Sequence, residues 1–378
     1  MSRLDELIQE YCPNGVEYRK LEDCCNILDN KRKPVTKAAR EAGKYPYYGA
    51  NGIQDYVSDY IFDGTFVLVG EDGSVITKSG TPVVTWAEGK IWVNNHAHII
   101  EGTDGVLLRY LFHYIQTIDV TPLIHGNIPK LTGKDFRALL IPVPPLEVQR
   151  EIVRILDNFT ELTAELTAEL TARKKQYEYY RDELIENPHG EVIECKMGDM
   201  LTFLNGRAYK QEELLSEGKY PVLRVGNFYT NDSWYYSDLE LDESKYCDNG
   251  DLLYSWAATL GPKIWNGEKC IFHYHIWKIL FEEKEVDKEY LYYFLQYDLA
   301  KIAKSTTKST MIHVSMGSMK ERQLILPSLE EQKRIASLIS KFDTLCCDIK
   351  NGLPAEITAR QNQYEYYRDK LLTFKEAQ

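Results

Sequence analysis

The sequence lacks the features that mark proteins of membranes and export routes. No apolar run approaches the roughly eighteen residues that a membrane-spanning helix needs. The first residues, Met1 to Leu7, do not place a basic segment before an apolar stretch, as a signal peptide would. We therefore expect a protein without a membrane partner that stays in the cytoplasm.

Motifs for catalysis and for metal binding are also missing. The eight cysteines contain no C-x-x-C pair, so the spacing of a zinc site is absent and reduced, apolar thiols are expected. There is no G-x-G-x-x-G, and Gly126 to Lys134 has the wrong spacing for a P-loop. The Asn/Asp-Pro-Pro-Tyr motif of amino-methyltransferases does not occur either. The sequence thus predicts no metal, no cofactor and no catalytic residue in this chain.

An overall basic charge is lacking too. The chain carries 45 lysines and arginines against 57 aspartates and glutamates, a net charge of −12, whereas duplex DNA binding normally shows a basic footprint. Acidic residues crowd the helical segments, while Lys31 to Lys33 and Lys301 to Lys308 are local basic sites. Charge alone leaves nucleic acid open as a partner without favouring it.

What the chain does have is an internal repeat with a period near half its length. Residues 172–184 return almost unchanged as 359–371, a match too long for chance. Weaker matches keep the same order: Gly43–Pro46 with Gly218–Pro221, His96–His98 with His273–His275, and Pro145–Arg150 with Ser328–Lys333. Each half therefore consists of a variable globular part followed by a better-matched helical part.

The helical parts carry apolar residues at spacings of three and four, which places them on one helix face. The first stripe follows a proline-rich start and comprises Ile152, Ile155, Phe159, Leu162, Leu166 and Leu170. The second follows Ser328 and Glu331, which are spaced as a capping box, and Asn351 to Pro354 should break or kink it. Packed core helices are one interpretation. The length from Leu146 to Ile185, about 60 Å of helix, favours a coiled-coil spacer instead.

The repeat is circular. Residues 5–8 match 182–185, and Pro13 to Gly15 parallels Pro188 to Gly190. The chain thus begins with the tail of a repeat unit. We expect its two termini to meet in space, the N-terminal helix to complete the C-terminal arm, and a pseudo-two-fold molecule to result.

The globular parts alternate strand and helix signals. Thr65–Val69, Pro82–Trp86 and Lys278–Phe281 are typical of strands between Gly and Asp turns. Leu107–Gln116 and Lys288–Gln296 are typical of short helices. We predict a mixed α/β domain in each half.

One arm contains a tandem tetrapeptide. Residues 163–166 and 167–170 both consist of Thr-Ala-Glu-Leu, after a degenerate copy at 160–162. Phe159 to Gln176 is four residues shorter than the matching Phe342 to Gln363, so the arms differ by one such unit. Four helical residues add about 6 Å along the axis and about 40° of rotation. A regular amphipathic helix explains part of the pattern, and the unit also suits a role in adjusting the length of the arm.

Together these motifs resemble the specificity subunits of type I restriction-modification enzymes. The resemblance rests on the proline-rich entries, on the E-x-Q-x-x-I helix starts at Glu147–Ile152 and Glu330–Ile335, and on the Q-Y-E-Y-Y-R-D endings. The tandem tetrapeptide and the stretch Leu353–Gln361 are similar to one subfamily, type IC. The likeness covers essentially the whole chain, with specific helical motifs and a match only in outline for the globular parts.

The resemblance implies an α+β chain with two mixed α/β target recognition domains, separated by two long antiparallel helices that form a coiled-coil spacer. The expected bounds are 1–145 for the N-terminal helix and first recognition domain, and 146–187 for the first spacer helix. The second recognition domain would span 188–327 and the second spacer helix 328–378. Each recognition domain would read one half of a bipartite double-stranded DNA sequence, and the helices would set the unspecified spacer.

The resemblance also implies partners that carry the chemistry. Two methyltransferase (M) subunits would bind the helices, hold S-adenosylmethionine and methylate adenine. Restriction (R) subunits would use ATP and Mg for translocation and cleavage. The chain itself would be the non-catalytic, sequence-reading part of the complex.

Reading DNA requires cations for phosphates and flat polar side chains for base edges. Candidate DNA contacts in the first half are Lys31, Arg32, Lys78, Ser79, Asn95, His96, His125, Asn127 and Lys130. Those in the second half are Arg207, Tyr209, Arg224, Asn227, Lys263, Lys304, Lys308, Ser309, Thr310 and His313. The basic, hydroxyl-rich segment from Lys304 to Thr310 is the strongest of these, although a solvated surface loop explains it equally well.

The two H-x-H pairs and the tyrosine-rich helix ends allow more than one interpretation. Residues two apart on a strand share a face, so two imidazoles could bind a metal. No third ligand is evident, and a hydrogen-bonded structural pair is favoured, with DNA contact as the remaining option. The helix ends would be either core or partner surface. Candidate partner contacts there are Tyr177, Tyr180, Arg181, Tyr364, Tyr367 and Arg368.

Two other classes of function stay open. A coiled-coil scaffold that organises protein partners and binds no DNA fits the acidic charge. A nuclease or methyltransferase with an unusual motif is disfavoured by the missing motifs. Methyl-transfer assays of the chain alone and with partner subunits would separate the three.

Overall fold

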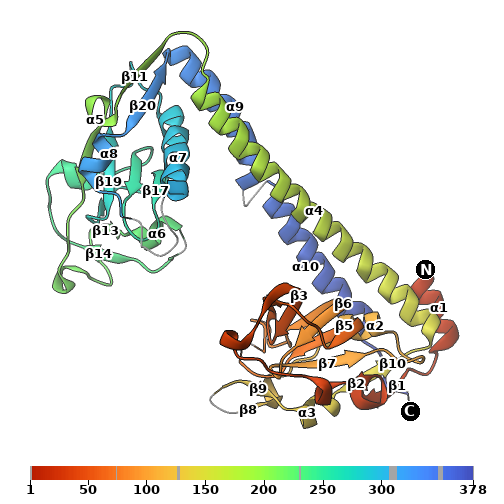
Figure 1. Cartoon of the computed structure of the whole chain (residues 1–378). Helices are drawn as coiled ribbons and strands as arrows, with labels where there is room; N and C mark the ends of the chain where they lie inside the picture. Colours follow the sequence, from red (N-terminus) through yellow and green to blue (C-terminus); the bar gives the residue numbers. More distant parts are fainter. Residues whose placement is uncertain are drawn as a thin grey trace. The chain divides into compact units, whose positions relative to one another are not determined.

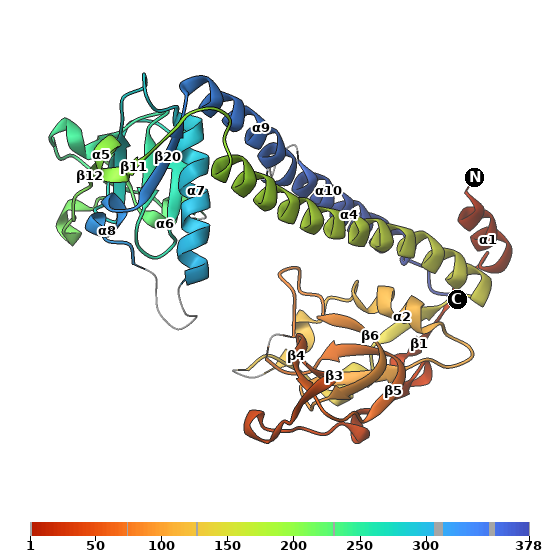
Figure 2. The ribbon, with the colours of Figure 1, turned by 45° about the horizontal axis from the view of Figure 1, so that its top comes forward.

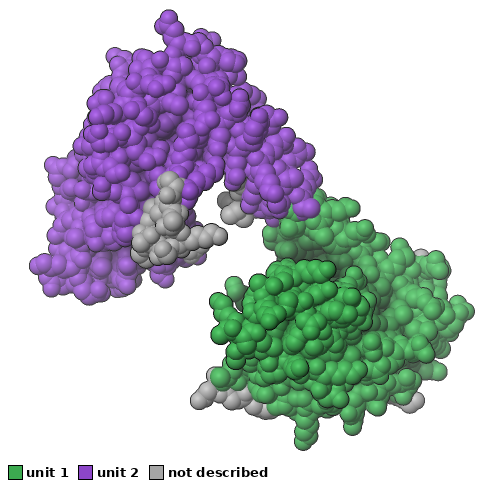
Figure 3. All heavy atoms as spheres, in the orientation of Figure 1, with its two compact units in different colours: residues 1–167, 356–378 green, residues 168–355 purple. Residues whose placement is uncertain are grey.

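The computed structural model describes residues 2–73, 75–125, 128–229, 231–305, 313–347 and 352–377. The chain forms two compact units, which we call unit 1 and unit 2 (Figure 3). Unit 1 contains residues 1–167 and 356–378, and unit 2 contains residues 168–355. Each unit holds one globular domain and a part of the helical arms (Figure 1). No helix among the described residues has a segment long and apolar enough to cross a membrane.

The domain of unit 1 is built on a six-stranded sheet. Its strands are β2 Asn26–Ile27, β3 Ala42–Gly49, β4 Gly52–Val57, β5 Phe62–Gly70, β6 Val84–Val93 and β7 Ala97–Glu101. They lie in the order β2-β7-β5-β6-β3-β4, and neighbours are antiparallel except β3 and β6, which are parallel. The strands expected at Thr65–Val69 and Pro82–Trp86 lie in β5 and at the start of β6.

A helix and two short sheets complete this domain. The expected helix at Leu107–Gln116 is α2 (Leu108–Ile115), which packs on β5 and β6 (Figure 1). Its Phe112 ring lies 5.7 Å from that of Trp86 on β6, measured between centroids. The remaining elements are β1 Glu17–Lys20, β8 Ile124–His125, β9 Lys130–Leu131, α3 Gly133–Arg137 and β10 Leu140–Val143, with 3₁₀ turns at Leu21–Asp23, Asp29–Lys31, Lys37–Ala39 and Thr121–Leu123. β1 pairs with β10, and β8 with β9, both antiparallel.

The domain of unit 2 repeats this plan. Its strands are β11 Val192–Lys196, β12 Thr202–Asn205, β13 Tyr220–Leu223, β14 Tyr235–Ser237, β15 Tyr246–Cys247, β16 Leu252–Ser255, β17 Gly261–Ile264, β18 Cys270–Phe272, β19 Ile276–Leu280 and β20 Gln323–Pro327. Its helices are α5 Met197–Met200, α6 Val225–Tyr229, α7 Lys288–Ser305 and α8 Met316–Lys320, with 3₁₀ turns at Gln211–Glu213 and Glu243–Lys245. The expected helix at Lys288–Gln296 is longer in the structure, and as α7 it packs against β17 and against α9 (Leu329–Cys347) of the arm (Figure 2).

The two domains share their strand order, but two central strands of unit 1, β5 and β6, are each divided in unit 2. Unit 2 has sheets with the orders β12-β19-β16-β17 and β14-β13-β18-β15, plus the pair β11-β20. In unit 1, β6 pairs with β5 along its length and with β3 at its end. In unit 2 its place is taken by β17 and β18, because residues 265–269 interrupt the strand. The strand β5 is divided in the same way into β15 and β16, and joining β15 to β16 and β17 to β18 reproduces the order of unit 1, so the sequence repeat is a repeat of fold.

Three long helices make up the arms: α4 Leu146–Glu186, α9, and α10 Leu353–Leu371. The end of α9 and the start of α10 flank the predicted break at 351–354, of which Asn351 lies outside the described residues. The predicted capping box at the start of α9 is only half formed. The Glu331 N–H donates to Ser328 Oγ at 3.3 Å, but the Glu331 carboxylate accepts from Arg334 and from the His189 N–H instead.

Equivalent aromatic pairs join the arm helices in the two units. In unit 1, Phe159 of α4 stacks on Tyr367 of α10 with centroids 5.4 Å apart. In unit 2, Phe342 of α9 stacks on Tyr180 of α4 at 5.8 Å. The two phenylalanines occupy the same repeat position and so do the two tyrosines, so the same aromatic pair joins two arm helices within each unit. The expected pairing of long antiparallel helices and the expected repeat are confirmed.

The tandem tetrapeptide segment of α4 is less buried than its apolar stripe suggests. Leu166 and Leu170 are half-buried, and Leu162 is exposed. A two-helix arm encloses only a narrow seam, so leucines at its flanks stay in contact with water. The segment therefore depends on helix propensity and backbone hydrogen bonds more than on a core.

The two termini meet in unit 1, as the circular repeat predicts. The Val16 N–H donates to Lys375 O at 2.9 Å, and the Ala377 N–H donates to Val16 O at 2.9 Å. Gly15 precedes this contact with a φ of +99°, and a Cβ there would lie 2.4 Å from Lys375 O, so only glycine fits. The N-terminal helix α1 (Arg3–Tyr11) packs on the arm through Leu4, which shares a buried cluster with Leu372.

Candidate functional site

Three chain segments meet at one end of the unit 1 sheet, through the backbone of Glu71. The Glu71 N–H donates to His96 O at 2.8 Å, and its carbonyl accepts from the Leu131 N–H at 2.8 Å. This ties the turn after β5 to the turn before β7 and to the segment before α3. We call the residues at this point the unit 1 junction: Glu71, Asn95, His96 and Lys130.

A buried charge cluster lies under this junction. Arg32 donates from Nη1 to Glu71 Oε2 at 2.6 Å, and its Nη2 lies 3.6 Å from Asp29 Oδ2. His98 is fully buried, and its Nδ1 and Nε2 face Asp29 Oδ2 at 2.7 Å and Leu131 O at 3.0 Å. Both ring nitrogens of His98 therefore face an oxygen that can accept a hydrogen bond. Burial would raise the pKa of Asp29, but hydrogen bonds from His98 and the Ile99 N–H and the charge of Arg32 lower it overall.

The same cluster is the best candidate for a metal site among the described residues. Ligand atoms of Asp29, Glu71 and His98 lie within 4.8 Å of one another. The Arg32 guanidinium already sits between the two carboxylates, and Lys130 Nζ approaches Glu71 at 3.3 Å. These cations supply the compensating charge, so we assign no ion to the cluster. His98 has the structural role that was favoured for the H-x-H pairs.

A hollow of about 390 Å³ adjoins His96 in unit 1. Side chains that can both donate and accept hydrogen bonds line it, because Asn51 and Gln54 face it from the β3–β4 hairpin. His96 contacts the carboxylate of Asp72, and exposed Ile128 forms an apolar edge. Amide groups beside an imidazole suit the edges of DNA bases.

Unit 2 has the same junction with different side chains. The Trp256 N–H donates to His275 O at 3.0 Å, and its carbonyl accepts from the Val314 N–H at 3.4 Å. Trp256 thus stands where Glu71 stands, His275 where His96 stands, and His313, which precedes Val314, where Lys130 stands. We call the unit 2 junction Trp256, Tyr274, His275 and His313.

The structural register corrects one of the sequence matches. The pairing of His96–His98 with His273–His275 is wrong by two residues. The His96 N–H donates to Asn94 Oδ1 at 2.8 Å, while the His275 N–H approaches His273 Nδ1 at 3.5 Å, so Asn94 is the counterpart of His273. Backbone pairing sets this alignment, and a histidine two positions away matched only by coincidence.

Aromatic rings replace the charges at the unit 2 junction. The Trp256 ring lies 5.0 Å from the His275 ring and 6.0 Å from the His313 ring, between centroids, and its Nε1 donates to Tyr274 O. Burial, aided by His275 and Arg224, lowers the pKa of His273 to about 4. Burial and His313 also lower the pKa of His275. Around neutral pH these two imidazoles are neutral, so each can donate and accept a hydrogen bond.

Several predicted DNA contacts are used inside the fold. Arg32 belongs to the charge cluster, Arg207 makes two hydrogen bonds to Glu213, and Lys263 donates to Phe228 O. Asn227 donates to Asn231 O and Ser233 O within its own loop, and Tyr209 donates to Phe272 O at 3.5 Å. These side chains are not free for phosphates unless local structure changes.

Other predicted contacts are exposed or fall outside the described residues. Arg224 lies over the ring of Tyr235 at 5.2 Å, and Lys304 is 4.0 Å from Asp182. Exposed candidates are Lys31, Lys78, Ser79, Asn95, His96, Lys130, Arg224, Lys304 and His313. Outside the described residues are Asn127, Lys308, Ser309 and Thr310, together with the side chain of His125.

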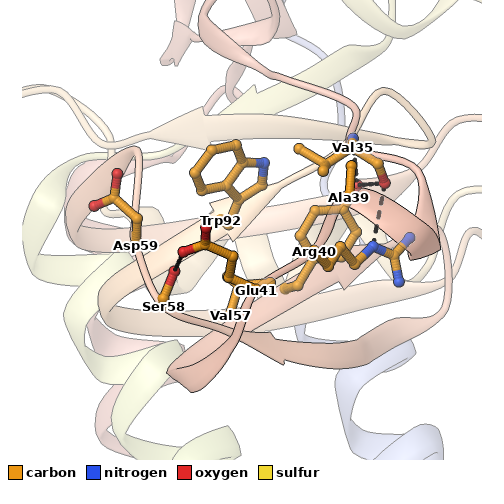
Figure 4. A pocket seen from close by; sticks show the side chains of 9 residues that line it. Val35, Ala39, Arg40, Glu41, Val57, Ser58, Asp59 and Trp92 are labelled. Carbon is orange, nitrogen blue, oxygen red and sulfur yellow. Dashed lines mark hydrogen bonds between the residues drawn. The ribbon is translucent and has the colours of Figure 1, made fainter.

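A second hollow in unit 1, of about 160 Å³, lies between residues 35–41 and the sheet (Figure 4). Arg40 lies over Tyr47 at 4.1 Å, donates to Val35 O and pairs with Asp55. These bonds fasten the basic segment after Lys31 onto the sheet. They occupy the guanidinium, so this hollow positions a loop and offers no free cation.

The predicted partner residues divide into buried and exposed groups. Tyr177 is buried and donates to Gln296 Oε1 at 3.0 Å, and its counterpart Tyr364 contacts His113 Nδ1 at 2.9 Å. Arg181 and Arg368 each pair with the following aspartate and lie 5.6 Å from the ring of the tyrosine four residues earlier. The two tyrosines therefore join each arm to its own domain, and each arginine contacts its tyrosine within the same helix. The neighbouring Tyr179 and Tyr366, for which the sequence left core and partner surface open, are 63% and 62% exposed.

Sequence reasoning therefore missed several residues of the candidate site. Glu71, Trp256 and Tyr274 stand at the junctions, and Asn51 and Gln54 line the hollow beside His96. The Asn51-Gly52 turn is a recognisable hairpin signal that would have pointed to the amide pair. Glu71 and Trp256 have no local signal, since their partners lie far away in sequence.

Comparisons with known proteins agree with this architecture. The chain matches the model of the type I restriction modification DNA specificity domain over residues 13–173 and 190–359. A Haemophilus influenzae protein named as a type I restriction enzyme specificity subunit is 39% identical over 378 residues, 95% of this chain and 96% of that protein. The EcoR124I/EcoR124II specificity subunit of Escherichia coli is 30% identical over 291 residues, 71% of either chain. The M. genitalium type I S subunit shares the fold, with a TM-score of 0.57 at 16% identity over 95% of this chain and 96% of that one.

Proposed function

Since this chain belongs to the family of type I restriction-modification DNA specificity subunits, we propose that its two domains each read one half of a split DNA sequence. One observation carries this proposal: the two domains share strand order and junction geometry but not junction chemistry. Two domains with identical junction side chains would be expected to bind the same half-site sequence. A charged junction in unit 1 and an aromatic one in unit 2 call for two different half-sites.

The exposed cations supply the contacts to phosphate. Lys31, Lys78 and Arg224 are exposed and make no ion pair with any residue in the described ranges. Each such contact adds salt-dependent affinity without sequence preference. The acidic total charge does not oppose this by itself, because it is a sum over the whole chain, whereas these three cations lie at the surface of the recognition domains. The recognition domains would be residues 1–145 and 188–327.

The exposed tyrosines of the arms fit two copies of one protein partner. Tyr179 and Tyr366 have nearly equal exposure, and each contacts a tyrosine, Tyr180 or Tyr367, that stacks on the facing helix. Equal patches on related surfaces bind equal partners. We assign them to two methyltransferase subunits, with restriction subunits joining the complex.

The chemistry belongs to those partners. S-adenosylmethionine would be held by the methyltransferase subunits, and ATP with Mg by the restriction subunits. The complex would act in the cytoplasm, where the chromosome lies. The tandem Thr-Ala-Glu-Leu units remain our reason for predicting the type IC subfamily.

Exchange of one domain tests the division of labour. Residues 2–141 would be replaced by the matching domain of a relative, and methylated adenines mapped in cells that also express the methyltransferase subunit. One half of the methylated motif should change and the other should stay. A change in both halves, or in neither, would contradict modular reading.

Extension of α4 tests the spacer. Duplicating residues 167–170 adds up to about 6 Å of helix, against about 3.4 Å for one base pair of DNA. The unspecified spacer should lengthen by one or two base pairs while both half-sites keep their bases. Full methylation with an unchanged spacer would show that the helix does not set it.

A further inference from the structure

Three of the four residues in each junction are placed by the same backbone hydrogen bonds, and we call these three residues the trio of that unit. The side chain at two of the three positions differs between the units, and its partners differ at all three. Glu71 corresponds to Trp256, His96 to His275, and Lys130 to His313, because the same backbone hydrogen bonds join the same three segments. The surrounding strand pairs agree with this alignment. Gly70 pairs with Ala97 in unit 1, and Ser255 with Ile276 in unit 2.

One half-buried residue of each trio, Glu71 in unit 1 and Trp256 in unit 2, contacts the other two residues. The Glu71 carboxylate faces Lys130 Nζ at 3.3 Å, and Glu71 is half-buried. Trp256 is half-buried as well, and its ring contacts both His275 and His313. Its indole N–H is used by Tyr274 O, so it has no donor left for a base. Glu71 and Trp256 are therefore positioning residues.

The outer members, together with Tyr274 of the unit 2 junction, lie where a ligand can reach them, although in unit 1 His96 contacts Asp72 and Lys130 pairs with Glu71. Tyr274, His275 and His313 make no side-chain hydrogen bond to any residue that the structure describes, and Tyr274 and His313 are exposed. In unit 1, the side chains of His96 and Lys130 are 48% and 46% exposed. A lysine favours the acceptor pair of guanine in the major groove, whereas neutral imidazole and phenol groups accept and donate on any base edge.

We propose that these trios are the specificity-determining positions of the two domains, with Trp256 and Glu71 positioning the residues that touch the bases. The ligand at each is the edge of a base pair in duplex DNA. This rests on the proposed function, since it names the residues by which each domain would read its half-site. The unit 1 trio would read through a lysine ammonium group and an imidazole, and the unit 2 trio through the imidazole rings of His275 and His313.

The test uses the complete complex in cells, with methylated adenines mapped for each variant. His275→Ala combined with His313→Ala should relax base preference about tenfold or more at one or more positions of one half-site, the usual size of a lost base contact. His96→Ala combined with Lys130→Ala should do the same to the other half-site. Lys284→Ala, an exposed change on unit 2 outside the junction, should alter neither.

Two further variants keep the result readable if the double changes unfold a domain. His313→Lys places the unit 1 residue into unit 2 and should change the preferred base in the unit 2 half-site only. Trp256→Phe keeps a ring but loses the indole N–H, so it should relax that same half-site, whereas a purely structural role would lower methylation at every sequence equally.

The outcomes separate this inference from the function it rests on. Variants that lower methylation uniformly and leave every base preference intact would overturn the assignment of the trios. A wild-type complex that methylates without any split motif would overturn the proposed function itself.

Discussion

Two buried glutamines show where units 1 and 2 are alike. In unit 1, Gln149 accepts from the Leu107 N–H at 2.9 Å and donates to Pro144 O and Gly105 O. In unit 2, Gln332 accepts from the Asp287 N–H at 2.8 Å and donates to Pro327 O and Glu285 O. Both glutamines stand at the start of an arm helix. Their partners are backbone groups, so the joint between arm and domain survives when domain side chains change.

The other end of each sheet behaves differently. At the junctions, side chains meet side chains: Arg32 meets Glu71 in unit 1, whereas Trp256 meets two histidines in unit 2. The backbone hydrogen bonds at the junctions are the same in both units, whereas the side chains differ. A protein that reads two different half-sites with one fold needs this arrangement, because the joint to the helices stays constant while the reading surface varies.

The largest difference between the units should appear on removing the buried cation of unit 1. Arg32→Met removes the guanidinium between Asp29 and Glu71, whose side chains are only 9% and 12% exposed, and should cost about 3 kcal/mol of unit 1 stability, the low end for a buried pair because His98 and Lys130 remain as partners. Asp29 is ionised at neutral pH because its pKa is lowered, so the cost should shrink as acid protonates it. Urea unfolding, read by pulse proteolysis and mass spectrometry of unit 1 peptides, measures this.

A matched arginine in unit 2 provides the control. Arg207 and Glu213 also form a two-bond pair, but their side chains are 33% and 17% exposed, so Arg207→Met should cost about 1 kcal/mol or less. Equal losses in the two units would mean that burial does not distinguish these pairs.

Next in size is the loss of the shared joint. Gln149→Ala and Gln332→Ala each leave three backbone groups without their partner, of which one makes a buried and two make part-buried hydrogen bonds, and each should destabilise its own unit by about 1–3 kcal/mol. The same unit-specific unfolding measurement applies. If one variant left the unfolding free energy of its unit unchanged and the other lowered it, the two joints would share their geometry but not their contribution to stability.

Sequence reasoning succeeded where the repeat is local and failed where it is spatial. Gly43–Pro46 and Gly218–Pro221 do occupy the same register, since Tyr48 pairs in parallel with Val93 and Leu223 pairs in parallel with Phe272, its equivalent. The H-x-H match failed because its alignment depends on backbone bonds between segments distant in sequence. Arg32 was predicted as a phosphate contact for the same reason: its partner Glu71 lies 39 residues away, and no local pattern announces it.

Acid should separate the two junctions by a smaller effect. The pKa of His273 is about 4 in the fold, below its unfolded value, so unfolded chains bind the proton first and unit 2 loses stability as pH falls from about 6.5 toward 4. His273→Asn inserts the unit 1 counterpart, Asn94, which keeps an acceptor for the His275 N–H. The variant should match wild type at pH 7.5 and lose less unit 2 stability at pH 5. If the variant lost as much unit 2 stability at pH 5 as wild type, the acid sensitivity would arise from titratable groups other than His273.

The smallest effect concerns one residue in the turn after each central strand. Ala258 lies three residues beyond Ser255 with a φ of +63°, where unit 1 has Gly73, three residues beyond Gly70, with a φ of +84°. Alanine is strained in this region and glycine is not. Ala258→Gly should therefore stabilise unit 2 slightly, by about 1 kcal/mol at most, because the greater freedom of unfolded glycine offsets part of the relief.

Gly73→Ala should destabilise unit 1 by about 1 kcal/mol, since a Cβ there meets nothing within 4 Å and the conformation alone opposes it. Unit-specific urea midpoints at neutral pH measure both. Opposite signs in the two units would show that the turn has one conformation and that unit 2 tolerates strain beside Trp256. Losses in both would mean that the Ala258 methyl group is itself needed in its turn.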